Sequence, residues 1–309
     1  MLKIKKNTIV YIFSPVNKQT GGVEALHQLC DAFNNNGVKS EMIYASRKKG
    51  VLGGRIGEKL ELVDKDVPTV YRRYNVIVGK EIKFNQDNIL IFPEVWTRYI
   101  KQYSDITKVI WWLSVDNNVD EFKDYNDNSL HHFYQSVYAL HHLVRNGVEN
   151  YYPVYDYITV PILDGTKTDS VCYNPKKGME HTKKIIEKLA EQYQFVALEN
   201  MKPEEVGEAL SKSKIYIDFG GHPGKDRMPR EAVLNNNIII TSLEGSAFYS
   251  DDVKMPMDYK FQPTSVDRIC NRIKECMAQY DSLIDDFVMY KKRIEDEKNE
   301  FMQQVKDLI

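Results

Sequence analysis

Residues 215–242, IYIDFGGHPGKDRMPREAVLNNNIIITS, decide the fold of this chain. Two apolar runs within them, residues 215–219 and 238–240, are typical of interior strands of a parallel sheet. Between these runs, Asp226 suits a helix N-cap and Pro229 suits a first helical turn, where a missing N–H costs little. The stretch therefore predicts a strand, a glycine-rich turn, a short helix and a second strand.

The predicted turn places two cations, Lys225 and Arg227, beside a helix N-terminus. Exposed N–H groups and the helix dipole favour a phosphate at such a position. Glu231 lies early in the same helix, where its carboxylate can accept hydrogen bonds from sugar hydroxyls. These features together indicate a nucleotide-sugar site, and an ordinary solvated helix start with local ion pairs is the alternative.

Two further turns are expected at the same edge of the sheet, because ligands of open α/β sheets bind beyond the carboxyl ends of strands. One is basic and follows a predicted strand at residues 170–173. The other follows residues 238–242, and its glycine permits close backbone approach while its serine can donate to a phosphate oxygen. A plain loop is the alternative for this third turn. The candidate donor-binding residues of the three turns are Lys176, Lys177, His222, Gly224, Gly245 and Ser246.

This segment resembles the donor-binding region of GT-B glycosyltransferases, especially the large retaining group that includes many bacterial polysaccharide and lipopolysaccharide enzymes. In that family the second carboxylate of a Glu-x7-Glu motif begins a helix after a Gly/Pro turn, and Glu231 with Ala232 matches it. Residues 21–24, GGVE, are similar to the family's acceptor-side glycine loop. Residues 171–178, VCYNPKKG, are similar to the strand and basic turn that open its C-terminal domain. The three matches occur in the family's order and cover most of the chain.

The resemblance implies an α/β protein with two Rossmann-like domains facing across a cleft. Residues 1–160 would form the acceptor domain, residues 161–280 the nucleotide-sugar domain, and residues 281–309 a helix that packs back on the first domain. The implied activity is transfer of a sugar from a nucleotide sugar to a glycan or lipid-linked acceptor in bacterial cell-surface polysaccharide biosynthesis. Retention of configuration and independence of any metal or other cofactor are further expectations from the family.

The resemblance also implies roles for individual residues. Lys225 and Arg227 would stabilise the leaving diphosphate, with Lys177 assisting, and Glu231 would fix the ribose or the donor sugar. One departure concerns the first carboxylate of the family motif, because Pro223 stands eight positions before Glu231. The sequence leaves open whether His222, Lys225 or Asp226 occupies that space. Two alternative functions stay open: a sugar-nucleotide epimerase on the same fold, and a non-catalytic partner subunit, which Pro223 suggests.

The acceptor side offers weaker signals. The glycines after the first predicted strand would let that loop face the cleft, with a simple tight β–α turn as the alternative. Aromatic faces and side-chain hydrogen bonds suit sugars, but two adjacent tryptophans cannot share one face of a strand, so one of them is expected in the core. The acceptor-side candidates are Gly21, Gly22, Glu24, Trp96, Trp111, Trp112, Asp116 and Asn117.

The remaining pattern predicts alternating strands and helices in both halves. Residues 47–59, which are glycine-rich and basic, are expected to form a loop, and residues 150–164 are expected to connect the domains. The predicted strands are residues 8–13, 41–45, 76–78, 89–92, 109–113, 170–173 and 195–198. The predicted helices are residues 23–35, 129–146, 180–193, 203–211 and 282–309.

Composition limits the classes of protein. A chain of 309 residues is expected to form about two domains, and its net charge of −2 argues against nucleic-acid binding, which needs a clustered basic surface. No apolar run approaches the roughly 20 residues that span a bilayer. The C-terminal helix could associate peripherally with a membrane, but its acidic residues outnumber its basic ones, the wrong sign for anionic lipid. Four scattered cysteines without a Cys-x-x-Cys pair predict reduced thiols and a cytoplasmic location.

Two patterns suggest metal ligands. The pairs His131/His132 and His141/His142 lack a glutamate at zincin spacing, so a helix with surface and core histidines is the better interpretation. Asp64 and Asp66 form an Asp-x-Asp pair of the kind used by metal-dependent GT-A transferases, but the central lysine favours a polar loop. The sequence therefore predicts no metal site.

Overall fold

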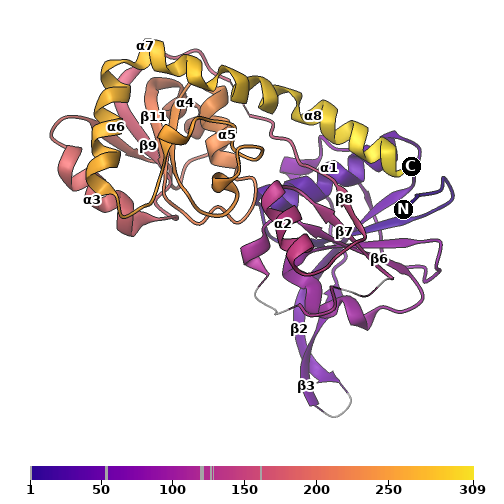
Figure 1. Ribbon diagram of the computed structural model, residues 1–309. Coiled ribbons are helices and arrows are strands. Elements are labelled where there is room, and N and C mark those ends of the chain that lie inside the picture. Colours follow the sequence, from indigo (N-terminus) through magenta and orange to yellow (C-terminus); the bar gives the residue numbers. More distant parts are fainter. Residues whose placement is uncertain (1, 53–54, 119–121, 126, 128, 161) are drawn as a thin grey trace. The chain divides into compact units, whose positions relative to one another are not determined.

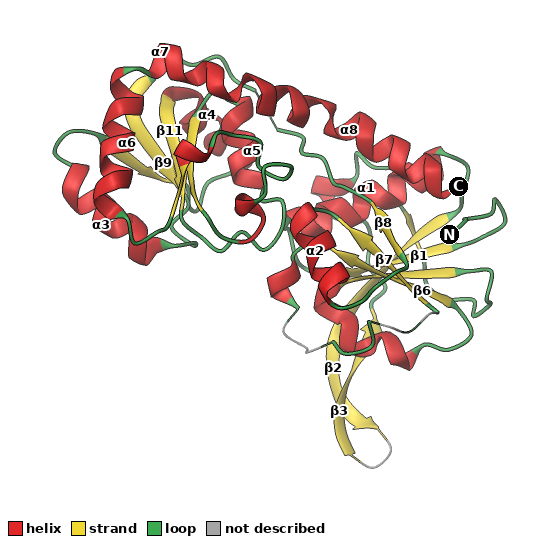
Figure 2. Cartoon of the chain, viewed as in Figure 1, coloured by secondary structure: helices red, strands yellow, loops and turns green. Residues whose placement is uncertain are grey.

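The computed structural model describes residues 2–52, 55–118, 122–125, 127, 129–160 and 162–309 (Figure 1). The chain divides into two compact units, the first comprising Met1–Asp156 with Asn299–Ile309 and the second Tyr157–Lys298. Each unit has a mainly parallel sheet with helices packed against it, as the strands and helices of Figure 2 show. Each unit therefore has the α/β architecture that the alternating pattern predicts.

The sheet of the first unit has the strand order β3-β2-β1-β5-β6-β7-β8, and β4 pairs with β2. All pairs are parallel except β2 with β3. The strand order changes direction between β1 and β5, which makes their carboxyl ends a topological switch point, where ligands of such sheets bind. The strands are β1 (Val10–Pro15), β2 (Ser40–Leu52), β3 (Arg55–Leu62), β4 (Ile77–Val78), β5 (Ile89–Pro93), β6 (Thr107–Trp112), β7 (Leu130–Tyr134) and β8 (Tyr151–Pro153).

Helix α1 (Gly21–Asn35) follows β1 as predicted. The Thr20 side chain caps it by accepting a hydrogen bond from the N–H of Val23 at 3.3 Å, and Gly37 follows its end at a φ of 79°. The other helices of this unit are α2 (Val137–Arg145) and the 3₁₀ helices η1 (Thr69–Tyr71), η2 (Glu94–Gln102) and η3 (Val115–Asn117).

The prediction of a loop at residues 47–59 is wrong. These residues contribute to a long β2–β3 hairpin, whose antiparallel register runs from Ala45 opposite Leu62 to Leu52 opposite Arg55. The hairpin extends beyond the rest of the sheet (Figure 1). Paired backbone groups hold such a ladder together, so it forms without the alternating apolar residues that identify a half-buried strand in a sequence.

The prediction of one helix at residues 129–146 is also wrong. Its first part is strand β7, and only its second part is helix α2. The division falls at Ser136, which has extended backbone and whose hydroxyl accepts a hydrogen bond from the N–H of Ala139 at 3.1 Å. His131 and His132 therefore lie on a strand, while His141 and His142 lie on a helix.

The sheet of the second unit is parallel throughout, with the order β10-β9-β11-β12-β13. Its switch point lies between β9 and β11. The predicted strand–turn–helix–strand unit is confirmed as β11, α5 and β12. The strands are β9 (Thr168–Tyr173), β10 (Gln194–Ala197), β11 (Ser213–Asp218), β12 (Ile238–Ser242) and β13 (Lys260–Phe261). The helices are α3 (Met179–Leu189), α4 (Pro203–Lys212), α5 (Arg227–Leu234), η4 (Gly245–Phe248), η5 (Met257–Tyr259), α6 (Val266–Ala278), α7 (Tyr280–Leu283), η6 (Ile284–Phe287) and α8 (Val288–Leu308).

A half-buried lysine fixes the ends of two of these helices. The Lys167 ammonium donates to the carbonyl oxygens of Leu210 at 3.0 Å, Ser213 at 2.7 Å and Asn235 at 2.7 Å. These carbonyls lie at the C-terminal ends of α4 and α5, where a cation also opposes the helix dipole. Burial lowers the pKa of Lys167 to about 8. The position of α5 in the sheet is therefore set at its C-terminus as well as at the turn that precedes it.

Helix α8 begins in the second unit and ends in the first, to which only its last part, Asn299–Ile309, belongs. Its buried side chains recur every three or four residues, which places them along one face. None of the helices in the described part of the chain has the length and apolar character needed to cross a bilayer. The buried residues of this face are Tyr290, Ile294, Glu297, Phe301, Val305 and Leu308.

Candidate functional site

Three turns meet at the carboxyl edge of the second sheet, after β9, β11 and β12. Gly178 in the first turn and Gly245 in the third adopt φ values of 59° and 52°, which favour glycine. A Cβ on Gly178 would lie 2.3 Å from the carbonyl oxygen of Phe219, and one on Gly245 would lie 2.0 Å from that of His222. The first and third turns therefore approach the backbone of the middle turn so closely that only glycine fits at positions 178 and 245.

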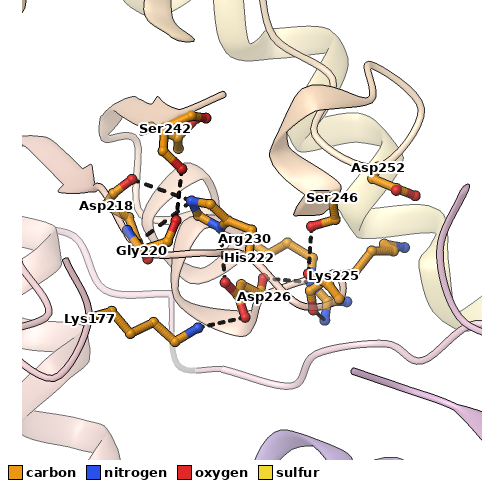
Figure 3. Close-up of polar contacts among 12 residues, drawn as sticks. Lys177, Asp218, Gly220, His222, Lys225, Asp226, Arg230, Ser242, Ser246 and Asp252 are labelled. Atoms are coloured by element: carbon orange, nitrogen blue, oxygen red, sulfur yellow. Dashed lines mark hydrogen bonds and ion pairs between the residues drawn. The ribbon is translucent and has the colours of Figure 1, made fainter. Parts of the chain in front are cut away.

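Hydrogen bonds join the middle turn to the third one (Figure 3). The Ser246 N–H donates to the carbonyl oxygen of His222 at 2.9 Å, and the Ser246 hydroxyl donates to that of Gly224 at 2.5 Å. The Ser242 hydroxyl donates to Gly220 O at 2.7 Å. Ser246 and Gly224, both predicted donor-site residues, thus contact each other and fix the shape of the turn.

Asp226 connects the middle turn to the first one. Its carboxylate lies 2.8 Å from the Lys177 ammonium through Oδ1 and 2.9 Å from Nδ1 of His222 through Oδ2 (Figure 3). Asp226 is the N-cap residue of α5, as predicted, but its side chain makes no capping hydrogen bond. Burial opposes its charge, yet the His222 and Lys177 contacts prevail and lower the pKa of Asp226.

His222 is buried between two aspartates in the same turn. Its Nδ1 faces Asp226, and its Nε2 lies 3.3 Å from the carbonyl oxygen of Asp218. Both ring nitrogens face acceptors, an arrangement that favours the doubly protonated ring. Burial disfavours the charged ring, but the hydrogen bond to Asp226 and the charges of both aspartates raise the pKa of His222. Its φ of 39° is uncommon outside glycine, and such strain concentrates at functional sites.

Asp218, His222 and Asp226 also form a group whose possible metal-ligand atoms lie within 4.8 Å of one another. An imidazole and two carboxylates are a ligand set that many metals accept. In this arrangement, however, the Lys177 ammonium contacts one carboxylate of the set and the imidazole nitrogens both face acceptors. The geometry thus suits an imidazole held by the Asp226 carboxylate on one side and by the backbone carbonyl oxygen of Asp218 on the other.

The three predicted catalytic residues make two separate ion pairs: Arg227 pairs with Glu231 on α5, and Lys225 pairs with Glu297 on α8. Nε of Arg227 bonds to Oε1 of Glu231 across one turn of α5, and the Arg227 side chain is 30% exposed. The Lys225 side chain is only 3% exposed, and its ammonium lies 2.9 Å from Oε1 of Glu297 on α8. Lys177, in the first turn, is 35% exposed. Arg227 and Lys177 are therefore the more accessible cations of this edge, and Lys176 beside them is exposed.

Arg230 and Glu297 belong to this site but did not emerge from the sequence. The Arg230 guanidinium is buried and bonds to Oε2 of Glu297 at 2.8 Å, to Lys225 O at 2.9 Å and to Asp226 O at 3.2 Å. A signal for Glu297 exists in the sequence, because it completes the apolar spacing of α8 between Ile294 and Phe301. A charged residue in such a stripe needs a buried partner.

The acceptor-side candidates lie at the carboxyl edge of the first sheet. Gly21 and Gly22 begin α1, directly after the loop that follows β1. Glu24 is buried and accepts hydrogen bonds from Arg73 and from the hydroxyl of Tyr74. The exposed residues Asp116 and Asn117 lie in η3 after β6. Asp116 accepts from Tyr138, with its Oδ1 2.7 Å from the hydroxyl.

The tryptophans are core residues. Trp96, Trp111 and Trp112 are all buried, so their faces are covered by protein. The indole N–H of Trp111 donates to Val154 O at 2.9 Å, and that of Trp112 donates to Nδ1 of His132 at 3.0 Å. The expectation that one of the adjacent pair is core thus extends to both.

The suggested metal patterns are occupied by other contacts. His132 bonds to Trp112, while Nε2 of His142 lies 2.8 Å from the hydroxyl of Tyr125. Asp64, in the polar segment after β3, contacts the ammonium of Lys80 at 3.1 Å, and both side chains are exposed.

Glu94 is a further carboxylate that the sequence analysis missed. It follows β5 directly, at the switch point of the first sheet, and its Oε2 accepts a hydrogen bond from the N–H of Leu113 at 3.1 Å. Burial raises the pKa of Glu94 to about 7. Its place after an apolar strand, as the first charged residue at a carboxyl end, is the signal that could have identified it.

Comparison with solved structures places this architecture. Sucrose-phosphate synthase from Thermosynechococcus elongatus matches with a TM-score of 0.67 at 10% identity, covering 98% of this chain and 98% of that one. Anabaena HepE in complex with UDP and glucose gives 0.65 at 10% identity, covering 97% and 99%. S. aureus TarM, solved with UDP, gives 0.55 at 12% identity, covering 74% of this chain and 56% of TarM. No family profile and no curated protein sequence matches the chain.

These neighbours are GT-B glycosyltransferases, and the chain has the GT-B fold. Its two mainly parallel sheets and its last helix, which begins in one unit and ends in the other, are the elements of that fold. The resemblance predicted from residues 21–24, 171–178 and 215–242 is therefore confirmed at the level of fold.

Proposed function

We propose that this protein is a glycosyltransferase that moves a sugar from a nucleotide sugar to a glycan or lipid-linked acceptor in bacterial cell-surface polysaccharide biosynthesis. The observation that supports this most is the pair of basic turns, after β9 and β11, that flank the switch point of the second sheet. UDP accompanies HepE and TarM in their structures, which makes UDP-sugars the first donors to test. We place the reaction in the cytoplasm, where nucleotide sugars are made.

The diphosphate would bind at these basic turns. Arg227 and Lys177 are partly exposed, and Arg227 opens the first turn of α5, where backbone N–H groups also favour an anion. As the glycosidic bond to the sugar breaks, charge develops on the diphosphate, and fixed cations lower the free energy of that transition state. Lys225 would contribute from within the turn, whose backbone it helps to hold.

Glu231 would hold hydroxyls of the ribose or of the donor sugar. In the protein alone, the Glu231 carboxylate bonds to Arg227. When a nucleotide sugar binds, Arg227 would contact its diphosphate and Glu231 its diol. The acceptor would bind at the carboxyl edge of the first sheet, where Gly21, Gly22 and Asp116 lie. We propose attack from the face that the leaving group occupies, with retention of configuration, and no metal in the reaction.

Titration calorimetry with UDP and UDP-sugars tests the donor site. Arg227→Ala and Lys225→Ala should each weaken binding by about tenfold or more, the usual loss for a hydrogen bond to a charged group. Lys274→Ala, which removes an exposed lysine of α6, is the matched control and should bind as the parent does. Unchanged affinity in both variants would remove the donor site from these turns.

Product analysis separates the alternatives. UDP release that depends on a glycan or lipid-linked acceptor supports transfer. Epimerisation or hydrolysis of the donor without an acceptor would instead identify a sugar-nucleotide epimerase. Binding of the nucleotide sugar without turnover against any acceptor would identify a non-catalytic subunit, the reading that Pro223 at the place of the first family carboxylate keeps open.

A further inference from the structure

A buried ionic cluster connects the donor turn to helix α8. Oε1 of Glu297 lies 2.9 Å from the Lys225 ammonium, and Oε2 lies 2.8 Å from Nη1 of Arg230. All three side chains are at most 3% exposed. One carboxylate of α8 thus contacts two cations that lie on either side of the start of α5.

Arg230 extends this cluster to the backbone of the turn. Its Nη2 donates to Lys225 O at 2.9 Å, and its Nε donates to Asp226 O at 3.2 Å. Asp226 in turn contacts Lys177 and His222. Glu297 therefore lies at one end of a continuous set of contacts that reaches both basic turns of the second sheet.

The cluster needs Glu297 to keep its charge. Two cations without a carboxylate at this depth would be costly, so loss of the charge would drive Lys225 or Arg230 towards other partners. Movement of Arg230 would break its hydrogen bonds to the carbonyl oxygens of residues 225 and 226, and the turn would lose its shape.

We propose that Glu297 is a positioning residue for the donor diphosphate, acting through Lys225 and Arg230 without touching the ligand. This inference rests on the proposed donor site. It also assigns a function to α8 in the second unit: the helix holds the phosphate-binding turn from outside the sheet. Since Asn299 and the residues after it belong to the first unit, the contact is made two residues before the helix leaves the second.

Binding of UDP and of uridine to Glu297→Gln tests the proposal. Glutamine keeps the size of the side chain but removes its charge. UDP affinity should fall about tenfold or more, whereas uridine, which has no phosphate, should bind within about twofold of the parent by ligand-observed NMR. A purely structural weakening of the unit would lower both affinities together.

A double-mutant cycle adds a second readout. If Glu297 acts largely through Lys225, then Glu297→Gln in a Lys225→Met background should cost less than about threefold in UDP affinity, because the shared interaction is already lost. Glu295→Gln, an exposed glutamate on the same helix, is the matched control and should equal the parent. Should the glutamine variant fail to fold, Glu297→Asp retains the charge one methylene further away and should show a smaller loss confined to UDP.

The outcomes are distinct. A parent protein that binds no UDP would overturn the proposed donor site and this role with it. A parent that binds UDP while folded Glu297→Gln binds it equally well would overturn the positioning role alone. Equal losses for UDP and uridine would reduce Glu297 to a general stabiliser of the unit. Fully additive effects in the cycle would overturn the action through Lys225.

Discussion

The carboxyl edges of the two sheets occupy equivalent places in similar β/α units, yet they hold charge differently. At the second sheet, two turns contribute cations, and Gly178 and Gly245 closely contact the backbone of the middle turn. At the first sheet, the switch point holds Glu94, a buried carboxyl whose pKa is raised to about 7, and Glu24 is bonded to Arg73 and Tyr74. The exposed charges of the second edge are cations, whereas the carboxylates of the first edge are buried and bonded to the protein. This contrast supports the proposal that the diphosphate binds at the second edge.

The largest effect that would sharpen this contrast is expected from Glu231→Gln. The substitution keeps the shape of the side chain but weakens its bonds to a diol, so transfer should fall by about ten- to a thousandfold, equivalent to about 1.4–4 kcal/mol of transition-state stabilisation. Transfer rate and UDP affinity should be measured side by side. UDP affinity close to that of the parent would indicate that Glu231 holds the donor sugar, and clearly weaker UDP binding that it holds the ribose. Parent-like transfer would leave Glu231 as an ordinary helix residue.

A large effect is also expected from Gly245→Ala. The new Cβ would lie 2.0 Å from the carbonyl oxygen of His222 at a φ of 52°, so the third turn or the middle turn must move. Strain and overpacking together should lower the free energy of unfolding by about 2–4 kcal/mol and weaken UDP binding. Gly221→Ala, in the middle turn itself, is the control because its Cβ would meet nothing within 4 Å. Equal denaturation midpoints for the two variants would contradict the tight contact between the turns.

The donor edge could be predicted from the sequence because its signals are local. Buried strands, a glycine-rich turn, cations and a proline in the first helical turn all occur within residues 215–242. The β2–β3 hairpin could not, because pairing of the backbone and not apolar periodicity forms it. Strand β7 was merged with α2 because both are apolar, and the helix start at Ser136 was overlooked.

The contacts within the candidate site could not be predicted from the sequence, for a different reason. Lys225 faces Glu297 instead of solvent because of how α8 packs. Some seventy positions separate the two residues, so no local sequence pattern reports the contact. Glu94 was missed because one carboxylate after a strand has no motif of its own. The sequence thus identifies which residues gather at an edge, whereas packing decides which of them stay accessible.

A smaller effect is expected from pH, and it concerns only the second edge. Because the pKa of folded His222 is raised above 6.5, its contribution to stability is complete below pH 6.5 and is lost as the pH rises through the folded value. Thermal unfolding midpoints of the parent should therefore decline over that range more steeply than those of His222→Asn, which removes the titrating group and tolerates a positive φ. Parallel pH profiles would show that the imidazole is not held by Asp218 and Asp226.

No effect is expected from chelation. If cations of the protein neutralise the diphosphate, transfer should persist at the parent rate after treatment with EDTA. Loss of activity that manganese or magnesium restores would overturn metal independence and direct attention to Asp218, His222 and Asp226. Substitution of Asp64 and Asp66 would then test the alternative Asp-x-Asp site.

The nesting of the three turns also bears on how this protein could be engineered. Since Gly178 and Gly245 contact the backbone of the middle turn from its two neighbours, an insertion in any one turn would displace the others. Libraries that vary these turns one at a time should yield mostly misfolded clones, and grafts from proteins of the same fold should succeed only when all three turns are exchanged as a set. New donor preferences are better sought in the segment after β10, where residues 199–202 are exposed and outside this contact.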